Sequence, residues 1–282
     1  SQGAVGGDVF TNADEAARQS SNPLGGDFMV ILNQWNIDFQ QGDITDETRY
    51  AYTHILQPVV PIGLGGDWIS VTRPTIPIIY SAELPSGPDL SSPGLAEFDS
   101  ESGFGDLILF SLLGTSTAVD SMGGGDRVLA AGFTSMFPTG SKEFTTDQYS
   151  LGPAGVAAFI GKDYIFGALG QHWWDVAEDE DNAPEINRSN LQVFYFLNFP
   201  GGWQVGGAPQ IEVDWEADSG DKWAVPIGLG VQKTQIMFGK MPVKFGVEAQ
   251  YYAVDRDTLG NEWRIQFTVA PIIPNIIGNL FK

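Results

Sequence analysis

The chain contains no cysteine and few charged residues, which make up only 17% of its 282 residues. Without cysteine it has no disulfide framework, no thiol nucleophile and no cysteine-based metal site. Basic residues are scarcer than acidic ones, with 14 lysines and arginines against 35 aspartates and glutamates, so the net charge is -21. Nucleic acid requires clustered lysine and arginine, and this balance argues against such a partner.

A long apolar run is also missing. No segment approaches the roughly 18 unbroken apolar residues that indicate a transmembrane helix. The first ten residues, SQGAVGGDVF, carry neither a basic region nor an apolar core, so we expect any signal peptide to have been removed. Hydrophobic residues nevertheless reach 43% and aromatic residues 12%. This combination leaves two classes open, a soluble β-sandwich and a membrane β-barrel.

Alternating side chains predict about twelve strands. In QIEVDWEADSGDKWAVPIGLGV, residues 210–231, apolar side chains alternate with polar or small ones on both sides of a polar turn. Most expected strands are about 10–14 residues long, whereas soluble strands have about 5–6 and a tilted membrane strand needs roughly 9–11. This length favours an antiparallel, up-and-down transmembrane β-barrel. The strands are expected at residues 28–40, 49–62, 67–80, 104–113, 127–138, 151–160, 164–174, 189–198, 203–215, 223–232, 242–253 and 262–273.

The links between these strands alternate in kind. Short turns such as GLGG at 63–66 and FPGG at 199–202 follow every second strand, and the other links are polar and often long. Outer-membrane barrels combine short periplasmic turns with longer external loops, so the alternation predicts that both termini lie in the periplasm. Two links, 114–126 and 233–241, are long for periplasmic turns.

Tryptophans gather near the expected strand ends, where an indole ring finds the membrane–water interface. Two of them begin strands at the short-turn end, and five lie at the long-loop end. Only Trp35 lies in the middle of a strand. We therefore predict an aromatic girdle made of Trp68, Trp203, Trp173, Trp174, Trp215, Trp223 and Trp263.

The polar face of the strands is expected to line a lumen. The predicted lining residues are Gln34, Asn36, Gln57, Arg73, Gln210, Glu212, Asp214, Lys244, Glu248, Gln250, Arg264 and Gln266. The two arginines of this set are expected to face Glu212 and Glu248. Small residues on the same face, such as Gly228, fit either tight interior packing or a channel. Prolines inside the strands remove ladder donors, so we expect each at a bulge or a strand end.

The first 27 residues are expected to form a separate segment, and residues 28–282 a single barrel. In NADEAARQSSN, Asn12 and Glu15 have the spacing of a capping box before a short helix, and a frayed tail is the other interpretation. The segment is expected either to hang in the periplasm or to enter the lumen as a plug.

Several motifs occur in the order found in one known family. They include NPLGGDFMVILNQWNI, DWISVTRPTIPIIY, GALGQHWWDVAED, FLNFPGGWQVGGAPQIEVDWEA, KWAVPIGLGVQK and EWRIQFTVAPIIP. Over roughly residues 22–274 the chain resembles the bacterial outer-membrane β-barrel family linked to transport in the phenol meta-cleavage (MetA) degradation pathway. The resemblance implies a barrel in the outer membrane of a Gram-negative cell. The stretch around 82–103 and the tail beyond Pro274 depart from the family pattern.

A porin-like channel is the function that these features favour. We predict passive uptake of small molecules, including aromatic or hydrophobic ones. The alternative is a structural barrel whose lumen is closed by side chains, because twelve strands lie between the filled barrels of about eight and the open ones of sixteen or more. Expected partners are outer-membrane lipid and lipopolysaccharide, a small-molecule solute and the barrel-assembly machinery during biogenesis.

We expect no enzymatic activity, no cofactor and no metal site. A membrane hydrolase would combine a serine, a histidine and an acid or amide, and the chain offers only His54 and His172 without a local motif. The acidic stretch DVAEDEDNAPE could bridge lipopolysaccharide through divalent cations in a structural role. It lacks the spacing of an EF-hand loop, so a solvated run of charge is the main interpretation.

Overall fold

A computed structural model describes residues 12–22, 24–25, 28–86, 96–178, 184–238 and 241–278. Its helices are α1 (Ala13–Gln19) and the 3₁₀ turn η1 (Ser121–Gly123). Its strands are β1 (Phe28–Gly42), β2 (Thr45–Gly65), β3 (Trp68–Ser86), β4 (Glu97–Phe104), β5 (Leu107–Val119), β6 (Gly125–Phe137), β7 (Gln148–Gly161), β8 (Tyr164–Glu178), β9 (Asn187–Phe199), β10 (Trp203–Gly207), β11 (Gln210–Asp214), β12 (Trp223–Met237), β13 (Met241–Val254) and β14 (Gly260–Pro274). None of the described helices has the length and apolar character needed to cross a bilayer.

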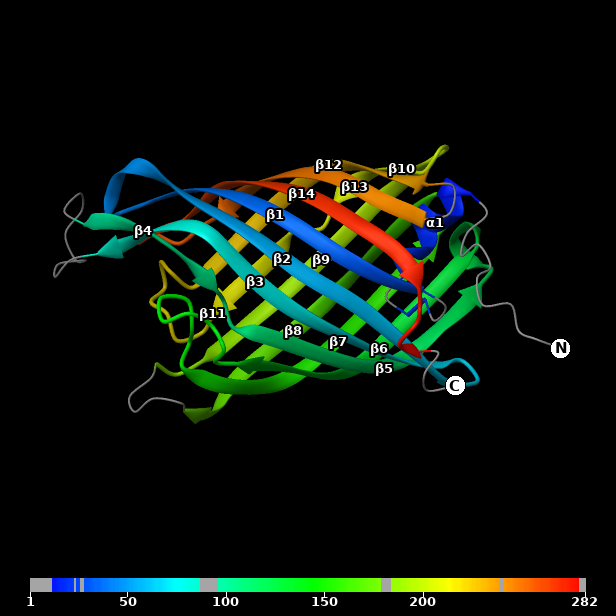
Figure 1. The fold of residues 1–282 in the computed structure, drawn as a ribbon, viewed down its shortest axis with the longest axis horizontal. Coiled ribbons are helices and arrows are strands. Elements are labelled where there is room, and N and C mark those ends of the chain that lie inside the picture. Colours follow the sequence, from blue (N-terminus) through cyan, green and yellow to red (C-terminus); the bar gives the residue numbers. More distant parts are fainter. Residues whose placement is uncertain are drawn as a thin grey trace.

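The strands form one antiparallel sheet that closes on itself (Figure 1). The first strand, β1, pairs with the last, β14, and this pairing completes the ring. Two strands of the wall are interrupted: β4 and β5 both pair with β3, and β10 and β11 both lie between β9 and β12. The result is a closed antiparallel barrel of twelve strands with one short N-terminal helix, which confirms the predicted fold class.

Each predicted strand coincides with one strand of the wall, and most are longer than expected. The second runs over Thr45–Gly65 instead of 49–62. Because β5 and β6 both extend toward their connection, the link expected at 114–126 shrinks to 120–124, and the link at 233–241 shrinks to 238–240 in the same way. Both links are then short, so the alternation of link lengths holds around the barrel.

Several strand prolines lie where the hydrogen-bond ladder is irregular. Pro58 of β2 and Pro74 of β3 fall in the same gap of their ladder, which Gln57 bridges by donating from Nε2 to Thr75 Oγ1 at 2.9 Å. Pro226 lies at a register shift of β12 against β13, and a further proline lies in the break between β10 and β11. These positions suit a residue without an N–H group.

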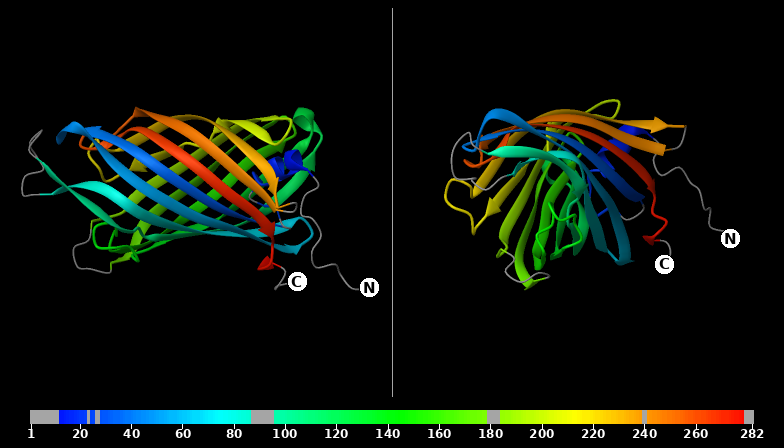
Figure 2. Two further views of the ribbon diagram at one scale, coloured as in Figure 1. Left: turned by 45° about the horizontal axis from the view of Figure 1, so that its top comes forward. Right: turned by 60° about the vertical axis from the view of Figure 1, so that its left-hand side comes forward.

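The helix α1 begins at the predicted cap, where the Asn12 side-chain oxygen accepts a hydrogen bond from the Glu15 N–H at 2.8 Å. It lies at the end of the barrel where β1 begins and β14 ends (Figure 2). It contacts β7, β9, β10, β12 and β13, which together make up much of the wall. Ala16 and Ala17 are buried, because small side chains let the helix pack inside this end of the barrel.

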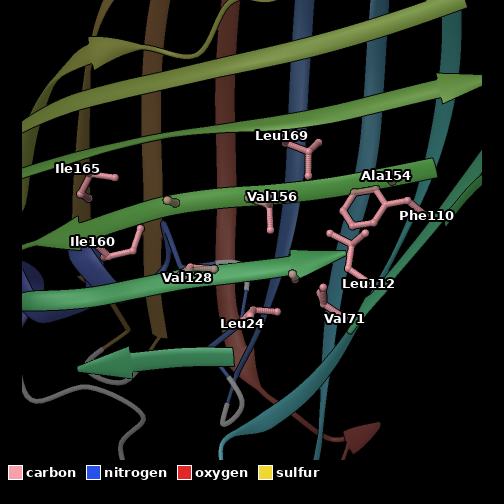
Figure 3. Packing of buried hydrophobic residues seen from close by; sticks show 12 residues of the cluster. Leu24, Val71, Phe110, Leu112, Val128, Ala154, Val156, Ile160, Ile165 and Leu169 are labelled. Carbon is pink, nitrogen blue, oxygen red and sulfur yellow. The ribbon is translucent and has the colours of Figure 1, made fainter. Parts of the chain in front are cut away.

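The apolar core lines the inside of one wall. It consists of side chains from β3, β5, β6, β7 and β8 together with Leu24 from the N-terminal segment (Figure 3). Its larger members are Leu24, Val71, Phe110, Leu112, Val128, Val156, Ile160, Ile165 and Leu169. The outer face of the same strands also carries exposed apolar side chains, such as Leu113, Leu129 and Phe166. This wall is therefore apolar on both faces, whereas the sequence predicted a polar lining.

Candidate functional site

Two cavities follow one another along the inside of the barrel. The loop-end cavity, toward the long loops, has a volume of about 610 Å³, and the turn-end cavity, toward α1, has a volume of about 200 Å³. Gln34, Ala208 and Gln266 line both cavities. We call these three residues the neck, because they mark the level at which the two cavities meet.

All of the predicted lumen-lining residues lie on one of these cavities. The loop-end cavity has Asn36, Gln57, Gln210, Glu212, Asp214, Gln250 and Arg264, the turn-end cavity has Arg73, Lys244 and Glu248, and the neck has Gln34 and Gln266. The period-two alternation of strand side chains is sufficient to place them inside. A role for them in solute passage stays a prediction.

The neck is held by neutral groups that bond to one another across neighbouring strands. Gln34 Nε2 donates to Gln266 Oε1 at 3.2 Å, and Gln266 Nε2 donates to Asn36 Oδ1 at 3.1 Å. All three side chains are buried. Because these amides satisfy one another, the level at which the cavities meet is polar without carrying net charge.

The cations of the loop-end cavity are neutralised by carboxylates. Its arginines form the ion pairs Arg264–Asp38, Arg188–Asp214 and Arg256–Glu212, at 2.5, 3.0 and 3.2 Å. The first pair is bidentate, since Arg264 Nη2 also donates to the second Asp38 oxygen at 2.9 Å. Arg264 interacts electrostatically with Glu212 and Glu248, as expected, but its direct ion-pair partner is Asp38, which lies opposite it on β1.

The loops at the long-loop end are joined above this cavity. The backbone N–H and the hydroxyl of Thr258 donate to the two Asp221 oxygens at 2.8 and 2.6 Å, and Asp221 itself lines the cavity. In the same loop, burial raises the pKa of the Asp255 carboxyl, while the Arg256 N–H that donates to it acts in the opposite direction. These contacts fix the loops around the mouth of the loop-end cavity.

The turn-end cavity contains cations of a different kind. Arg73 stacks on the Phe110 ring, with its Cζ 4.2 Å from the centroid, and its buried Nε has no hydrogen-bond partner among the described residues. Lys244 is only 8% exposed, and its Nζ donates to Ser21 Oγ at 3.0 Å. Within the described part of the chain, neither cation forms an ion pair with a carboxylate.

The one carboxylate of the turn-end cavity is held by the break in the wall. Both oxygens of Glu248 accept from the Ala208 N–H, at 3.1 and 3.0 Å, and one also accepts from Gln250 Nε2 at 2.9 Å. A Cβ on Gly228 would collide with this carboxylate. The inner glycine on β12 therefore serves tight packing, since it lets Glu248 reach across to the end of β10.

The N-terminal segment reaches the turn-end cavity from α1. Ser20, Ser21 and Asn22 line that cavity, and Leu24 joins the apolar cluster. Asn22 Nδ2 donates to Ser116 Oγ at 2.9 Å, while Arg18 in α1 makes an ion pair of 3.4 Å with Asp126. The segment is thus bonded to β5 and β6 as well as to β13.

Six of the seven tryptophans assigned to the girdle are exposed, and their place at a membrane interface stays a prediction. Trp68, Trp203, Trp174, Trp215, Trp223 and Trp263 are all exposed. Trp173 is only 6% exposed, lines the loop-end cavity and donates from Nε1 to Thr134 Oγ1 at 3.1 Å. Its assignment to the girdle is wrong, because adjacent residues in a strand point to opposite faces and Trp174 takes the outer one.

Both histidines face outward, since Thr53 and Ile55 beside His54 and Trp173 beside His172 line the loop-end cavity. His54 Nε2 lies 3.0 Å from Asn33 Oδ1. His172 Nδ1 lies 2.7 Å from Ser189 Oγ, which also accepts from Trp215 Nε1 at 2.9 Å. The other ring nitrogen of His172 has no partner among the described residues, so this contact lacks the orienting third group of a catalytic triad.

No group of three or more potential metal ligands occurs in the described part of the chain. The acidic stretch singled out for divalent cations lies partly outside it, because residues 179–183 are not among the described ones. Asp175, at the start of that stretch, accepts from the Ile186 N–H at 2.9 Å. A cation-binding role for the stretch therefore stays a prediction.

No family model matches the chain, and no curated protein matches it. The solved COG4313 outer membrane channel from Pseudomonas putida F1 is 12% identical, with 88% of this chain and 95% of that chain covered and a TM-score of 0.58. The NanC porin is 10% identical (86% and 98% covered, TM-score 0.48), and a Pseudomonas aeruginosa FadL homologue is also 10% identical (96% and 96% covered, TM-score 0.35). At such identities the likeness to the COG4313 structure shows a shared fold alone.

Proposed function

We propose that the chain forms an outer-membrane channel for the passive uptake of small molecules, including aromatic or hydrophobic ones. The observation that carries the proposal is the pair of cavities that meet at the neck inside a closed barrel. The COG4313 protein with the same fold is an outer membrane channel, which agrees with this proposal. The link to the phenol meta-cleavage pathway rests on the sequence resemblance alone.

An outer-membrane location is proposed on the character of the outer face. Large apolar side chains are exposed along the wall, for example Leu197 and Leu229, and the outward tryptophans lie toward the strand ends. A bilayer would cover the apolar band and leave the indole rings at its interfaces. Lipid, lipopolysaccharide and the barrel-assembly machinery are the partners that such a location requires.

The N-terminal segment is proposed to plug the short-turn end of this channel. Its support is the set of bonds from Arg18, Ser21 and Asn22 to the barrel wall and the burial of Leu24. These contacts order residues that would otherwise be free, so the segment should narrow the path from the turn-end cavity to the periplasm. The competing function is that of a structural barrel. In that case the same residues would remain inside permanently and keep the lumen closed.

Single-channel conductance in planar bilayers separates these two functions. We expect a small conductance from the full chain and a several-fold larger one after deletion of residues 1–25, because the deletion removes α1 and Leu24 from the lumen. Deletion of residues 1–11 is the matched control, since it shortens the chain and keeps every described contact of the segment. Absence of conductance and of solute flux into liposomes from both the full chain and the 1–25 deletion would leave the closed barrel as the function.

We infer that the chain is not an enzyme. The contact between Ser189 and His172 is its nearest approach to a hydrolytic site. There the serine oxygen is already held by Trp215, and no acid or amide among the described residues orients the histidine. Aromatic packing is the simpler role for His172, whose ring centroid lies 4.0 Å from that of Trp174.

A further inference from the structure

The two cavities differ in how their charges are satisfied. In the loop-end cavity every arginine is paired with a carboxylate and Asp221 is a further acid, so that cavity has no unpaired cation to offer an anionic solute. The turn-end cavity is lined by Arg73, Lys244 and a single carboxylate, Glu248, whose oxygens are already engaged by the Ala208 N–H and Gln250. Two cations therefore face this smaller cavity without a counter-ion among the described residues.

Burial makes such cations costly unless an anion accompanies them. Lys244 is nine-tenths buried, and an ammonium group has three donors, of which one is used by the neutral hydroxyl of Ser21. The Arg73 Nε is buried and has no hydrogen-bond partner among the described residues. The donors left over on Lys244 and Arg73 are of the kind that a carboxylate ligand satisfies.

One side of the turn-end cavity is apolar, while neutral amides and hydroxyls such as Gln192, Gln232 and Thr268 line the remainder. Phe194 and Phe196 project into it from β9, and Phe110 lines it from β5 beneath the Arg73 guanidinium. Val30, Leu32, Val59, Val156 and Leu169 complete this side. A hydrophilic anion such as phosphate would lose its hydration against these side chains without compensation, whereas an apolar body would replace water favourably.

The size of the turn-end cavity and the route to it further restrict the class of ligand that can bind there. A cavity of about 200 Å³ lies below the roughly 300–1,000 Å³ typical of drug-sized ligands, so a molecule of one ring or a short chain fits it best. The loop-end cavity, whose arginines are all paired, and the neutral neck separate the turn-end cavity from the acidic stretches at the long-loop end.

We propose that the turn-end cavity is a binding site for a small apolar monoanion, an aromatic or short aliphatic carboxylate, whose charge is taken by Lys244 and Arg73. This deepens the proposed function, on which it rests, because it assigns a substrate class to the narrow half of the channel. The N-terminal segment takes part in the site, since Ser21 holds the lysine and Asn22 lines the same cavity.

Calorimetric titration of the purified full chain in detergent tests the site. Benzoate is the probe, benzyl alcohol its neutral counterpart and inorganic phosphate an anion without an apolar body. We expect benzoate to bind more tightly than either, and Lys244→Gln to weaken benzoate roughly tenfold, as the loss of a charged hydrogen-bond partner predicts. Lys244→Arg keeps the charge and should retain most of the affinity.

Lys233→Gln is the matched control. It removes the same charge from the neighbouring strand, where Lys233 lies over the Trp203 ring at 4.8 Å and lines neither cavity. Equal effects of Lys233→Gln and Lys244→Gln would overturn the proposal, as would equal binding of benzoate and benzyl alcohol, or phosphate binding as tight as benzoate. If Lys244→Gln fails to fold, Arg73→Gln carries the same expectation.

The binding titration and the transport measurement can fail independently of each other. Conductance without benzoate binding would overturn this inference and leave the channel intact. Benzoate binding without conductance or flux would support the site and overturn the channel. The two failures are therefore distinguishable, because binding is measured in detergent and passage across a bilayer.

Discussion

At the residue scale, the inner glycines of β12 show how closely this interior is packed. A Cβ at Gly228 would collide with the carboxylate of Glu248, which bonds to the end of β10. We expect Gly228→Val to cost about 1–3 kcal/mol in the free energy of unfolding, because it overpacks the site and displaces that carboxylate. Urea unfolding of the protein refolded into liposomes measures this cost.

The outer face offers the control for this prediction. A Cβ at Gly170 of β8 would meet only the Leu191 Cδ1 at 3.8 Å, which is an ordinary contact. Gly170→Val should therefore change the stability by no more than about 0.5 kcal/mol. Equal costs would mean that valine disturbs the strand backbone at any glycine. The space that Gly228 leaves for the Glu248 carboxylate would then have no particular importance for stability.

Single residues were predicted well where alternation alone decides their face. The twelve polar side chains assigned to the lumen all line its cavities. A strand side chain can point to only two faces, so placing the apolar neighbours outside places these polar residues inside. Partners were predicted less well, since they depend on register. Arg264 pairs with Asp38 because β1 closes the barrel against β14, and no local pattern reveals that neighbour.

At the element scale, the outer face of β12 provides a direct test of lipid contact. Leu229 is 66% exposed in the middle of the strand, so Leu229→Arg places a charge against mid-bilayer lipid. We expect it to cost about 2–4 kcal/mol in unfolding free energy. Gln210→Arg is the control, because Gln210 lines the loop-end cavity near Glu212 and Asp214, where an added cation finds carboxylates.

An equal, small effect of both arginine substitutions would contradict a lipid-facing position for Leu229. Val213 is unsuited to this test, although the alternation of side chains assigns it to the outer face, as it does Leu229. It is only 6% exposed, and its ladder partners are Ser189 and Trp223. In the structure Val213 lines the loop-end cavity, although the alternation assigns it to the lipid face.

The existence of each strand could be predicted from the sequence, and the composition of one wall could not. Length and alternation suffice to find all twelve strands, because both faces of most strands differ in polarity. On β5 to β8 both faces are apolar, since the inner one packs against Leu24 of the N-terminal segment and the phenylalanines of the turn-end cavity. That inner contact involves residues far apart in sequence, so no local pattern encodes it.

At the scale of the whole molecule, the barrel has an apolar outside and a largely polar, partly apolar inside. Soluble monomers rarely expose contiguous apolar patches above a few hundred Å², whereas large apolar side chains here are exposed from β2 to β14. Among the described residues, the closed ladder pairs the strands around the ring on both sides, and only β4 at the long-loop end pairs on one side alone, so the backbone of the barrel wall is satisfied without help from a partner. Both properties follow from closing an alternating sheet on itself.

These two properties predict how the purified chain behaves without a membrane. We expect it to be monodisperse in detergent and to aggregate when the detergent is removed, because the apolar band then meets water. In SDS the unheated chain should migrate differently from the boiled one, since cold SDS cannot open a closed ladder. Light scattering and gel mobility provide the measurements, and the boiled sample is the unfolded control. A chain that stays monodisperse in plain buffer, or that migrates identically before and after boiling, would contradict the membrane location and with it the channel.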